Sequence, residues 1–198
     1  MDKNHLIDNF KKAILDQDWA KCMNITESLF AQMPLDVVAN LALKVVEEYV
    51  PNFQTEYPTD VWVSDRLSEI KYKLNNQITD SEDPTYPNFN KHYDTPGDNN
   101  FVGSVVELSL MLKYWNKPER AKELARDSTA SIIMANSLRN WGKANPDLWK
   151  RLMNPSNDSD KLILSIHFKT DPVALDNQFE AWLSLANDIE NWIRQDQS

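Results

Sequence analysis

Residues 35–50 read LDVVANLALKVVEEYV, and they form the strongest helical segment of the chain. On a helical wheel its polar residues share one sector of about 120°, and the other two thirds are apolar. These polar residues are Asp36, Asn40, Lys44, Glu47 and Glu48. A helix with so narrow a polar stripe belongs near the centre of a fold. Pro51 lacks a backbone donor and disfavours helical geometry at Val50, so we expect the helix to end or bend there.

The same periodicity continues over most of the chain, which holds only three glycines. We expect helices near residues 4–15, 18–32, 59–78, 101–115, 118–141, 146–152 and 171–193. Residues 101–115 are apolar almost all round and predict a second central helix. The short apolar run 162–168 fits either a helix or a strand. The prediction is therefore an all-α fold, a compact multi-helix bundle of about seven to nine helices with two central, mostly buried helices.

The helical pattern fails over residues 79–100. Prolines and a glycine punctuate this stretch, and a loop of this length is uncommon unless it is functional. It also holds an excess of acidic residues, namely Asp80, Glu82, Asp83, Asp94 and Asp98. We expect residues 1–198 to form a single all-helical domain, in which this long acidic surface loop separates two helical halves.

Composition narrows the class of protein. The 198 residues carry a formal net charge of −9, which disfavours contact with nucleic acid or an anionic membrane and would suit a basic protein partner. The first ten residues, MDKNHLIDNF, lack the apolar run of a secretory signal, and no apolar stretch approaches transmembrane length. A single cysteine, Cys22, allows no internal disulfide. We therefore expect a cytoplasmic protein. Nothing in the sequence speaks for or against a homo-oligomer.

Glu107 is the carboxylate of greatest interest, because it lies in an otherwise apolar helix. A buried carboxylate has a raised pKa and can act as a general acid or base, but such a group is more often structural and bonded to a neighbouring helix. The adjacent Glu47 and Glu48 would need Glu-x-x-His motifs to complete a di-metal site, and the chain contains none.

The other chemistry-bearing residues form no recognisable motif. The three histidines, His5, His92 and His167, lie far apart in the sequence, and Cys22 has no His–Asn pattern to activate it. No glycine-rich phosphate-binding pattern is present. We therefore assign no catalytic, cofactor-binding or metal-binding residue, and we expect no cofactor.

Two stretches carry a resemblance to a known family. The first is Glu47-Glu48-Tyr49-Val50-Pro51-Asn52-Phe53, in which a Pro-Asn-aromatic triplet follows an acidic, apolar helix. The second comprises Val106-Glu107-Leu108-Ser109 and residues 119–134, with Ala121, Glu123, Ser128 and Met134 in register. Over residues 35–141 the chain resembles the YjaG-like family, bacterial helical proteins without an assigned function. That resemblance implies an all-helical fold and transfers no catalytic residue.

A second resemblance is weaker. The central helix that ends in Pro-x-Phe is similar to a helical family of bacterial immunity proteins, which would imply that the chain neutralises a toxin by binding it. Neither resemblance supplies a site residue.

Two hypotheses on function follow. The sequence favours a nonenzymatic helical protein that binds another protein, because site chemistry is missing and aromatic residues are plentiful. The alternative is a small-ligand-binding protein or enzyme with a cleft between the helical halves near Glu107. Among the tryptophans, we expect Trp141 and Trp182 in the core, and Trp62, Trp149 and Trp192 half exposed.

Overall fold

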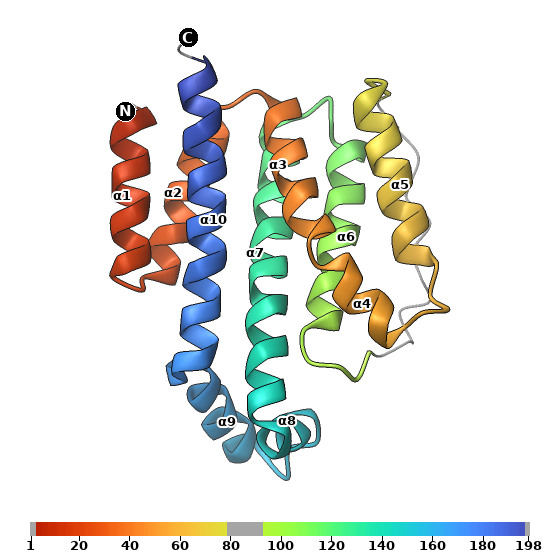
Figure 1. The fold of residues 1–198 in the computed structure, drawn as a ribbon, viewed down its shortest axis with the longest axis vertical. Coiled ribbons are helices and arrows are strands. Elements are labelled where there is room, and N and C mark those ends of the chain that lie inside the picture. Colours follow the sequence, from red (N-terminus) through yellow and green to blue (C-terminus); the bar gives the residue numbers. More distant parts are fainter. Residues whose placement is uncertain (1–2, 79–92, 197–198) are drawn as a thin grey trace.

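The computed structural model describes residues 3–78 and 93–196, and the regular structure in these ranges is entirely α-helical (Figure 1). The helices are α1 (Lys3–Leu15), α2 (Trp19–Ala31), α3 (Leu35–Glu47), α4 (Val50–Glu56), α5 (Trp62–Asn75), α6 (Asp98–Lys113), α7 (Pro118–Ala144), α8 (Pro146–Met153), α9 (Asp158–Thr170) and α10 (Pro172–Asp196). The all-α prediction is confirmed.

Helices α6 and α7 form the centre of the bundle. Along its 27 residues α7 contacts α2, α3, α6, α8 and α10, and its most extensive contact is with α6 (Figure 1). The prediction of a central helix over residues 101–115 is therefore confirmed. The helix at residues 35–50 also packs against several neighbours, but α7 rather than α3 is the second central helix. The hydropathy of α7 does not predict its central position, because many of its buried residues are alanine and serine. These small residues let helices approach closely.

Small hydroxyl residues join α7 to the helices on either side. Ser128 Oγ donates a hydrogen bond of 2.9 Å to the backbone oxygen of Ser104 in α6. Ser137 Oγ donates one of 2.8 Å to the backbone oxygen of Ala174 in α10. Both serines are fully buried, and a buried hydroxyl is costly unless it finds a partner. These bonds therefore satisfy polar groups at close helix contacts and fix the two neighbours of α7.

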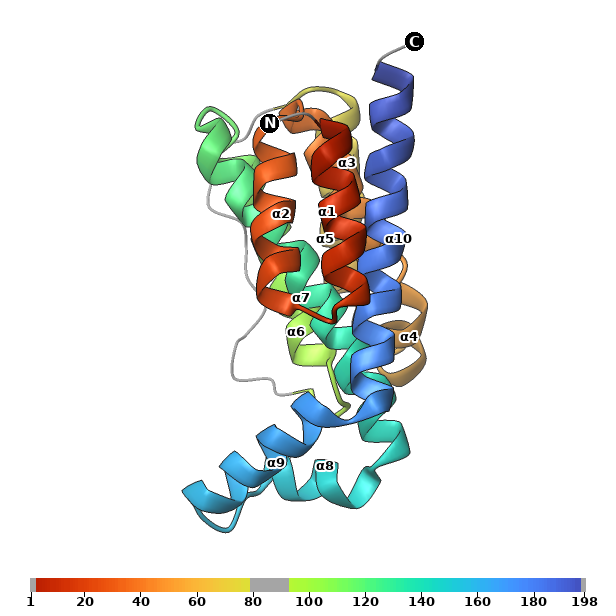
Figure 2. The same ribbon diagram turned by 90° about the vertical axis from the view of Figure 1, so that its left-hand side faces the viewer.

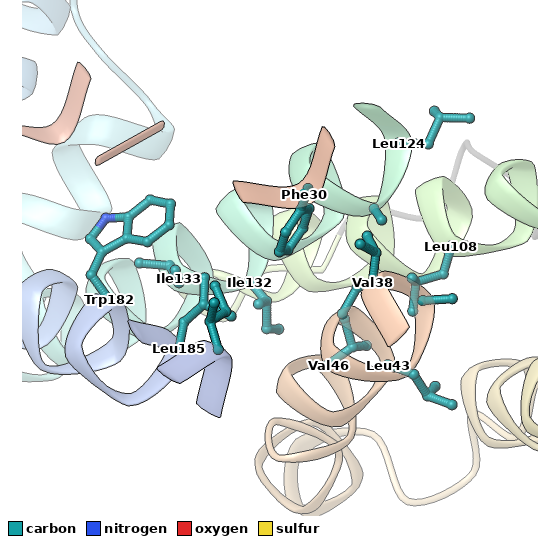
Figure 3. Close-up of a cluster of buried hydrophobic side chains, with 14 of the residues drawn as sticks. Phe30, Val38, Leu43, Val46, Leu108, Leu124, Ile132, Ile133, Trp182 and Leu185 are labelled. Carbon is teal, nitrogen blue, oxygen red and sulfur yellow. The ribbon is translucent and has the colours of Figure 1, made fainter. Parts of the chain in front are cut away.

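One large hydrophobic cluster runs through the bundle. It takes buried residues from each of the helices α1–α7 and from α10, and Figure 3 labels some of them: Phe30, Val38, Leu43, Val46, Leu108, Leu124, Ile132, Ile133, Trp182 and Leu185. The cluster therefore joins residues from both sides of the 79–92 stretch. The expectations for the tryptophans are also met, because Trp141 and Trp182 are fully buried while Trp62, Trp149 and Trp192 are half-buried.

The helix over residues 35–50 ends close to Pro51, as predicted, because α3 ends at Glu47. The chain bends at residues 48–49 and Pro51 then occupies the first turn of α4, where its missing N–H costs nothing, so α4 is a helix that the sequence analysis does not predict. The helix predicted from residue 101 begins at Asp98, directly after Pro96 and Gly97. Residues 79–92 of the predicted acidic loop lie outside the described residues.

Helices α8 and α9 form a separate hairpin at the end of the bundle opposite to the C-terminus (Figures 1 and 2). The ambiguous run 162–168 is helical, as part of α9. A second, smaller hydrophobic cluster fixes this hairpin to the ends of α7 and α10, and its buried members are Trp141, Phe168 and Ala174. None of the helices in the described ranges has the length and apolar character that a membrane span requires.

Candidate functional site

Glu107 lies on α6, and its side chain is half-buried. A hydrogen bond joins it to Ser131 of α7, while its Oε2 atom is buried and has no hydrogen-bond partner within the described ranges. Burial raises the pKa of Glu107 to about 7; the Ser131 hydrogen bond lowers it, and the charge of Asp127 raises it. The carboxyl group therefore changes its charge close to neutral pH.

Among the described residues, three surface grooves lie away from Glu107. The largest, about 470 Å³, is lined by residues of α3, α5 and α6, including Asp36, Lys73 and Leu112. A second, about 360 Å³, separates α3 and α4 from α5, and the ion pair between Lys71 Nζ and Glu47 Oε1, 3.0 Å long, lies within it. A third, about 80 Å³, lies between α2 and α7. Glu107 lines none of these three grooves, so none of them is the cleft of the alternative hypothesis.

A buried polar network joins α4, α6 and α7. The side chain of Asp98, in the first turn of α6, is fully buried and accepts a 2.8 Å hydrogen bond from Tyr49 Oη. Arg139 of α7, only 4% exposed, places its Nη1 atom 3.5 Å from Asp98 Oδ1 and donates a 2.9 Å bond from Nη2 to Glu56. The guanidinium carbon also lies 5.8 Å from the centre of the Tyr49 ring. The network therefore ties the chain around Pro51 to the two central helices.

The charges in this network are incompletely satisfied. Asp98 Oδ2 and the Nε and Nη1 atoms of Arg139 are buried and have no hydrogen-bond partner within the described part of the chain. Burial raises the pKa of Asp98 to about 6; the hydrogen bond from Tyr49 and the charge of Arg139 lower it, and Glu56 raises it. Burial also raises the pKa of the Tyr49 hydroxyl. None of the three grooves above is lined by Asp98, so the role of the network is to stabilise the packing of these helices.

The sequence predicts Asp98 among the solvated acids of the surface loop, and this prediction is wrong. Asp98 is buried because α6 begins three residues earlier than predicted and because Arg139 supplies a counter-charge from α7. Of the other four acids, Asp94 is exposed as expected, whereas Asp80, Glu82 and Asp83 lie outside the described residues. The sequence holds one signal for the burial of Asp98, and it is the position of Arg139. Arg139 lies four residues after the inward-facing Ala135 and therefore on the same face of α7.

Two tyrosines beside the network hold residues 93–97 against the bundle. Tyr93 Oη donates a 2.8 Å bond to Asp60, and Tyr57 Oη accepts a 3.2 Å bond from the backbone N–H of Thr95. Burial raises the pKa of the Tyr93 hydroxyl, and the bond to Asp60 raises it further. Together with Phe53 the two rings form an edge-to-face and tilted cluster, which fixes the start of α6.

The histidines and the cysteine stay apart in the fold. His5 and His167 are exposed on α1 and α9, and His92 lies outside the described residues. Cys22 is fully buried in α2, and this burial raises the pKa of its thiol to about 12, which makes it a weak nucleophile. Within residues 3–78 and 93–196 no three His, Cys, Asp or Glu side chains come together in a way that could hold a metal ion.

The outer face of α9 carries three of the large hydrophobic side chains that are exposed among the described residues. Leu162, Ile163 and Ile166 are 62%, 52% and 53% exposed and share one side of the helix. The opposite side of α9 is also apolar, because Leu164 and Phe168 point inward and Phe168 meets the Trp141 ring edge to face at 5.4 Å. Figure 2 shows α9 extending sideways from the end of the bundle. We call Leu162, Ile163 and Ile166 the α9 face.

The fold and these sites define an all-α helical bundle with an apolar surface on a projecting helix. Comparisons of the chain with protein-family models, with curated proteins and with solved structures find no match. Any assignment of function to this bundle therefore depends on its geometry alone.

Proposed function

We propose that the chain is a nonenzymatic, cytoplasmic protein that binds another protein, and that the α9 face is the contact surface. The observation that carries this proposal is the exposure of three large aliphatic side chains on one side of a helix whose other side is buried. A helix that is apolar on both sides is usually covered on both sides. A clustered apolar surface on a soluble domain commonly marks a protein interface.

The chemistry of the α9 face specifies the kind of partner. The side chains are aliphatic and are spaced at positions i, i+1 and i+4, which suits packing against an apolar stripe of another helix. Residues 145–171, which include α8 and α9, hold four acidic and four basic residues. Binding at this hairpin therefore needs no basic partner. A basic partner, as the sequence analysis expects, would instead be drawn to the remainder of the chain, which carries the whole net charge of −9.

The alternative, a small-ligand-binding protein or enzyme near Glu107, has one observation in its favour. Glu107 has a pKa of about 7 and one buried oxygen without a partner in the described residues, as a general acid or base would. It carries less weight because Glu107 lines none of the three described grooves. A ligand that perturbs the titration of Glu107 in an NMR experiment would favour this alternative.

The test compares binding by the native chain and by the double variant Leu162→Ser, Ile166→Ser. Val61→Ser is a matched control, because Val61 is 62% exposed but lies outside α9. A protein recovered from cytoplasm with the native chain and the control should be lost with the double variant. With purified components the double variant should bind that protein roughly tenfold more weakly or worse. Circular dichroism checks that both variants are folded. Equal binding by all three chains would refute the role of the α9 face.

A further inference from the structure

We propose that the α9 face binds the α9 face of a second copy of this chain, with the two helices antiparallel around a two-fold axis. This inference rests on the proposed function and names its partner. The partner is a second copy because, in this one arrangement, the apolar residues of the two α9 helices pack against each other and their charges pair with opposite charges.

The charges at the ends of α9 set the direction. Asp158 begins the helix and Lys169 lies near its end, and both are exposed. Eleven residues at about 100° each bring these two positions to within about 20° of one another, so they border the same edge of the α9 face. Neither side chain has an ion-pair partner within the described part of the chain. Both charges are therefore available to a partner.

In an antiparallel pair, residues on the same edge of the two helices face each other. With the two-fold axis between Ile163 and Leu164, Asp158 of each copy lies beside Lys169 of the other, so two unlike pairs form. The same register places Leu162 of one copy near Ile166 of the other and brings the two Ile163 side chains together at the centre. In a parallel pair each Asp158 would instead lie across from the opposite edge of the other helix, so neither Asp158–Lys169 pair could form.

The distribution of charge favours approach through this hairpin. Two copies that each carry −9 repel one another over most of their surface. The segment 145–171 is the exception, because its four acidic and four basic residues cancel. It also projects from the end of the bundle, so two α9 helices can meet while the acidic bundles stay apart (Figure 2).

The size of the contact sets the strength of association. A helix of 13 residues is about 20 Å long, and one pair of such helices buries less than the roughly 1,200 Å² of a standard stable interface. We therefore expect a reversible dimer with a dissociation constant of roughly 10 μM to 1 mM.

The experiment is sedimentation velocity over a concentration series up to about 1 mM, with the single variants Asp158→Lys and Lys169→Asp. Each variant alone should self-associate at least roughly tenfold more weakly than the native chain, because each places like charges at both ends of the pair. Mixed in equal amounts, the two variants should form a heterodimer about as strong as the native dimer. In that heterodimer both lysines of one chain face the two aspartates of the other, so two unlike pairs form again. Lys150→Asp, on the exposed surface of α8, reverses a charge in the same way and should leave self-association unchanged.

Each outcome decides the inference. A native chain that stays monomeric at about 1 mM overturns it. A dimer that is insensitive to both charge reversals, or variants that fail to recover on mixing while circular dichroism shows them folded, also overturns it. If the chain is monomeric but binds a different protein, and Leu162→Ser, Ile166→Ser abolishes that binding, the second copy is the wrong partner and the proposed function stands. If neither self-association nor binding of another protein depends on the α9 face, both proposals fail.

Discussion

Asp98 and Glu107 are both carboxyl groups of α6 shielded from water, and the fold treats them differently. Asp98 receives a hydrogen bond from Tyr49 and the nearby charge of Arg139, so its pKa is held to about 6. Glu107 receives one hydroxyl and faces the added negative charge of Asp127, and its pKa reaches about 7. The counter-charge is the difference, because an ionised carboxylate in a dry site needs a cation to offset its lost hydration.

For Glu107 the sign of the pH dependence is definite. Its pKa is raised from 4.5 to about 7, so its contribution to stability is fully present below pH 4.5 and is lost as the pH rises through 7. We expect Glu107→Gln to raise the free energy of unfolding by about 1–3 kcal/mol at pH 8 and to leave it nearly unchanged at about pH 4. Urea unfolding followed by tryptophan fluorescence measures this. Glu48→Gln, at an exposed position just after α3, is the control. An equal effect of Glu107→Gln at both pH values would show that ionisation is not the cause.

The pairing of Asp98 with Arg139 gives a second prediction. Arg139→Met leaves Asp98 buried without its counter-charge and should cost about 3–5 kcal/mol at pH 8. Asp98→Asn keeps an oxygen for Tyr49, and Arg139 keeps Glu56, so it should cost less. The double variant should be at least about 1 kcal/mol more stable than the sum of the two losses. This coupling should shrink at pH 5, below the pKa of Asp98, since the acid is then mostly neutral. Strict additivity at pH 8 would contradict the pairing.

At the scale of single elements, the sequence predicts what depends on periodicity and misses what depends on contacts. The buried residues of α1 and α10 follow helical spacing, and Asp18 is a residue type that favours the position before a helix, where its carboxylate accepts from the N–H of Lys21. The start of α6 is missed because Pro96 and Gly97 are loop signals, and the partner that buries Asp98 lies on α7. The α9 face is missed because an apolar run with no polar stripe does not show which side is covered.

Gly97 is where the start of α6 depends on one residue. Its φ of +88° lies in the left-handed region, and a Cβ atom there would lie 2.1 Å from the backbone oxygen of Ala135 on α7. We expect Gly97→Ala to lower the free energy of unfolding by at least about 2 kcal/mol, since strain and a backbone clash combine. Gly103→Ala, inside α6, is the control. Its Cβ would meet nothing within 4 Å, so the substitution should stabilise the protein by about 0.5–1 kcal/mol. Thermal unfolding of both variants tests the contrast, which would be lost if Gly97→Ala were tolerated equally well.

Over the whole molecule, two hydrophobic clusters of unequal size stabilise different groups of helices. The large one joins α1 to α7 and α10, whereas α8 and α9 are held by the small cluster around Trp141 and Phe168. Segments with few buried apolar contacts open at lower free energy than the rest of a protein. The hairpin that carries the α9 face is therefore the part of the described structure that should open most readily.

Hydrogen exchange tests this division directly. Amides of residues 146–170 should exchange at least roughly tenfold faster than those of α6 and α7. Phe168→Ala removes a ring that packs on Trp141, so it should accelerate exchange in residues 146–170 while changing the free energy of global unfolding by less than about 1 kcal/mol. Leu108→Ala, in the large cluster, should instead cost about 2–5 kcal/mol globally and accelerate exchange throughout the bundle.

If Phe168→Ala destabilised the bundle as much as Leu108→Ala does, the two clusters would be one cooperative unit. The helices that carry the α9 face would then be as stable as the bundle, and self-association would not slow hydrogen exchange in residues 146–170 any further. If the hairpin opens on its own, occupation of the α9 face should slow exchange in residues 146–170 and leave α6 and α7 unchanged, because a bound partner stabilises the closed form.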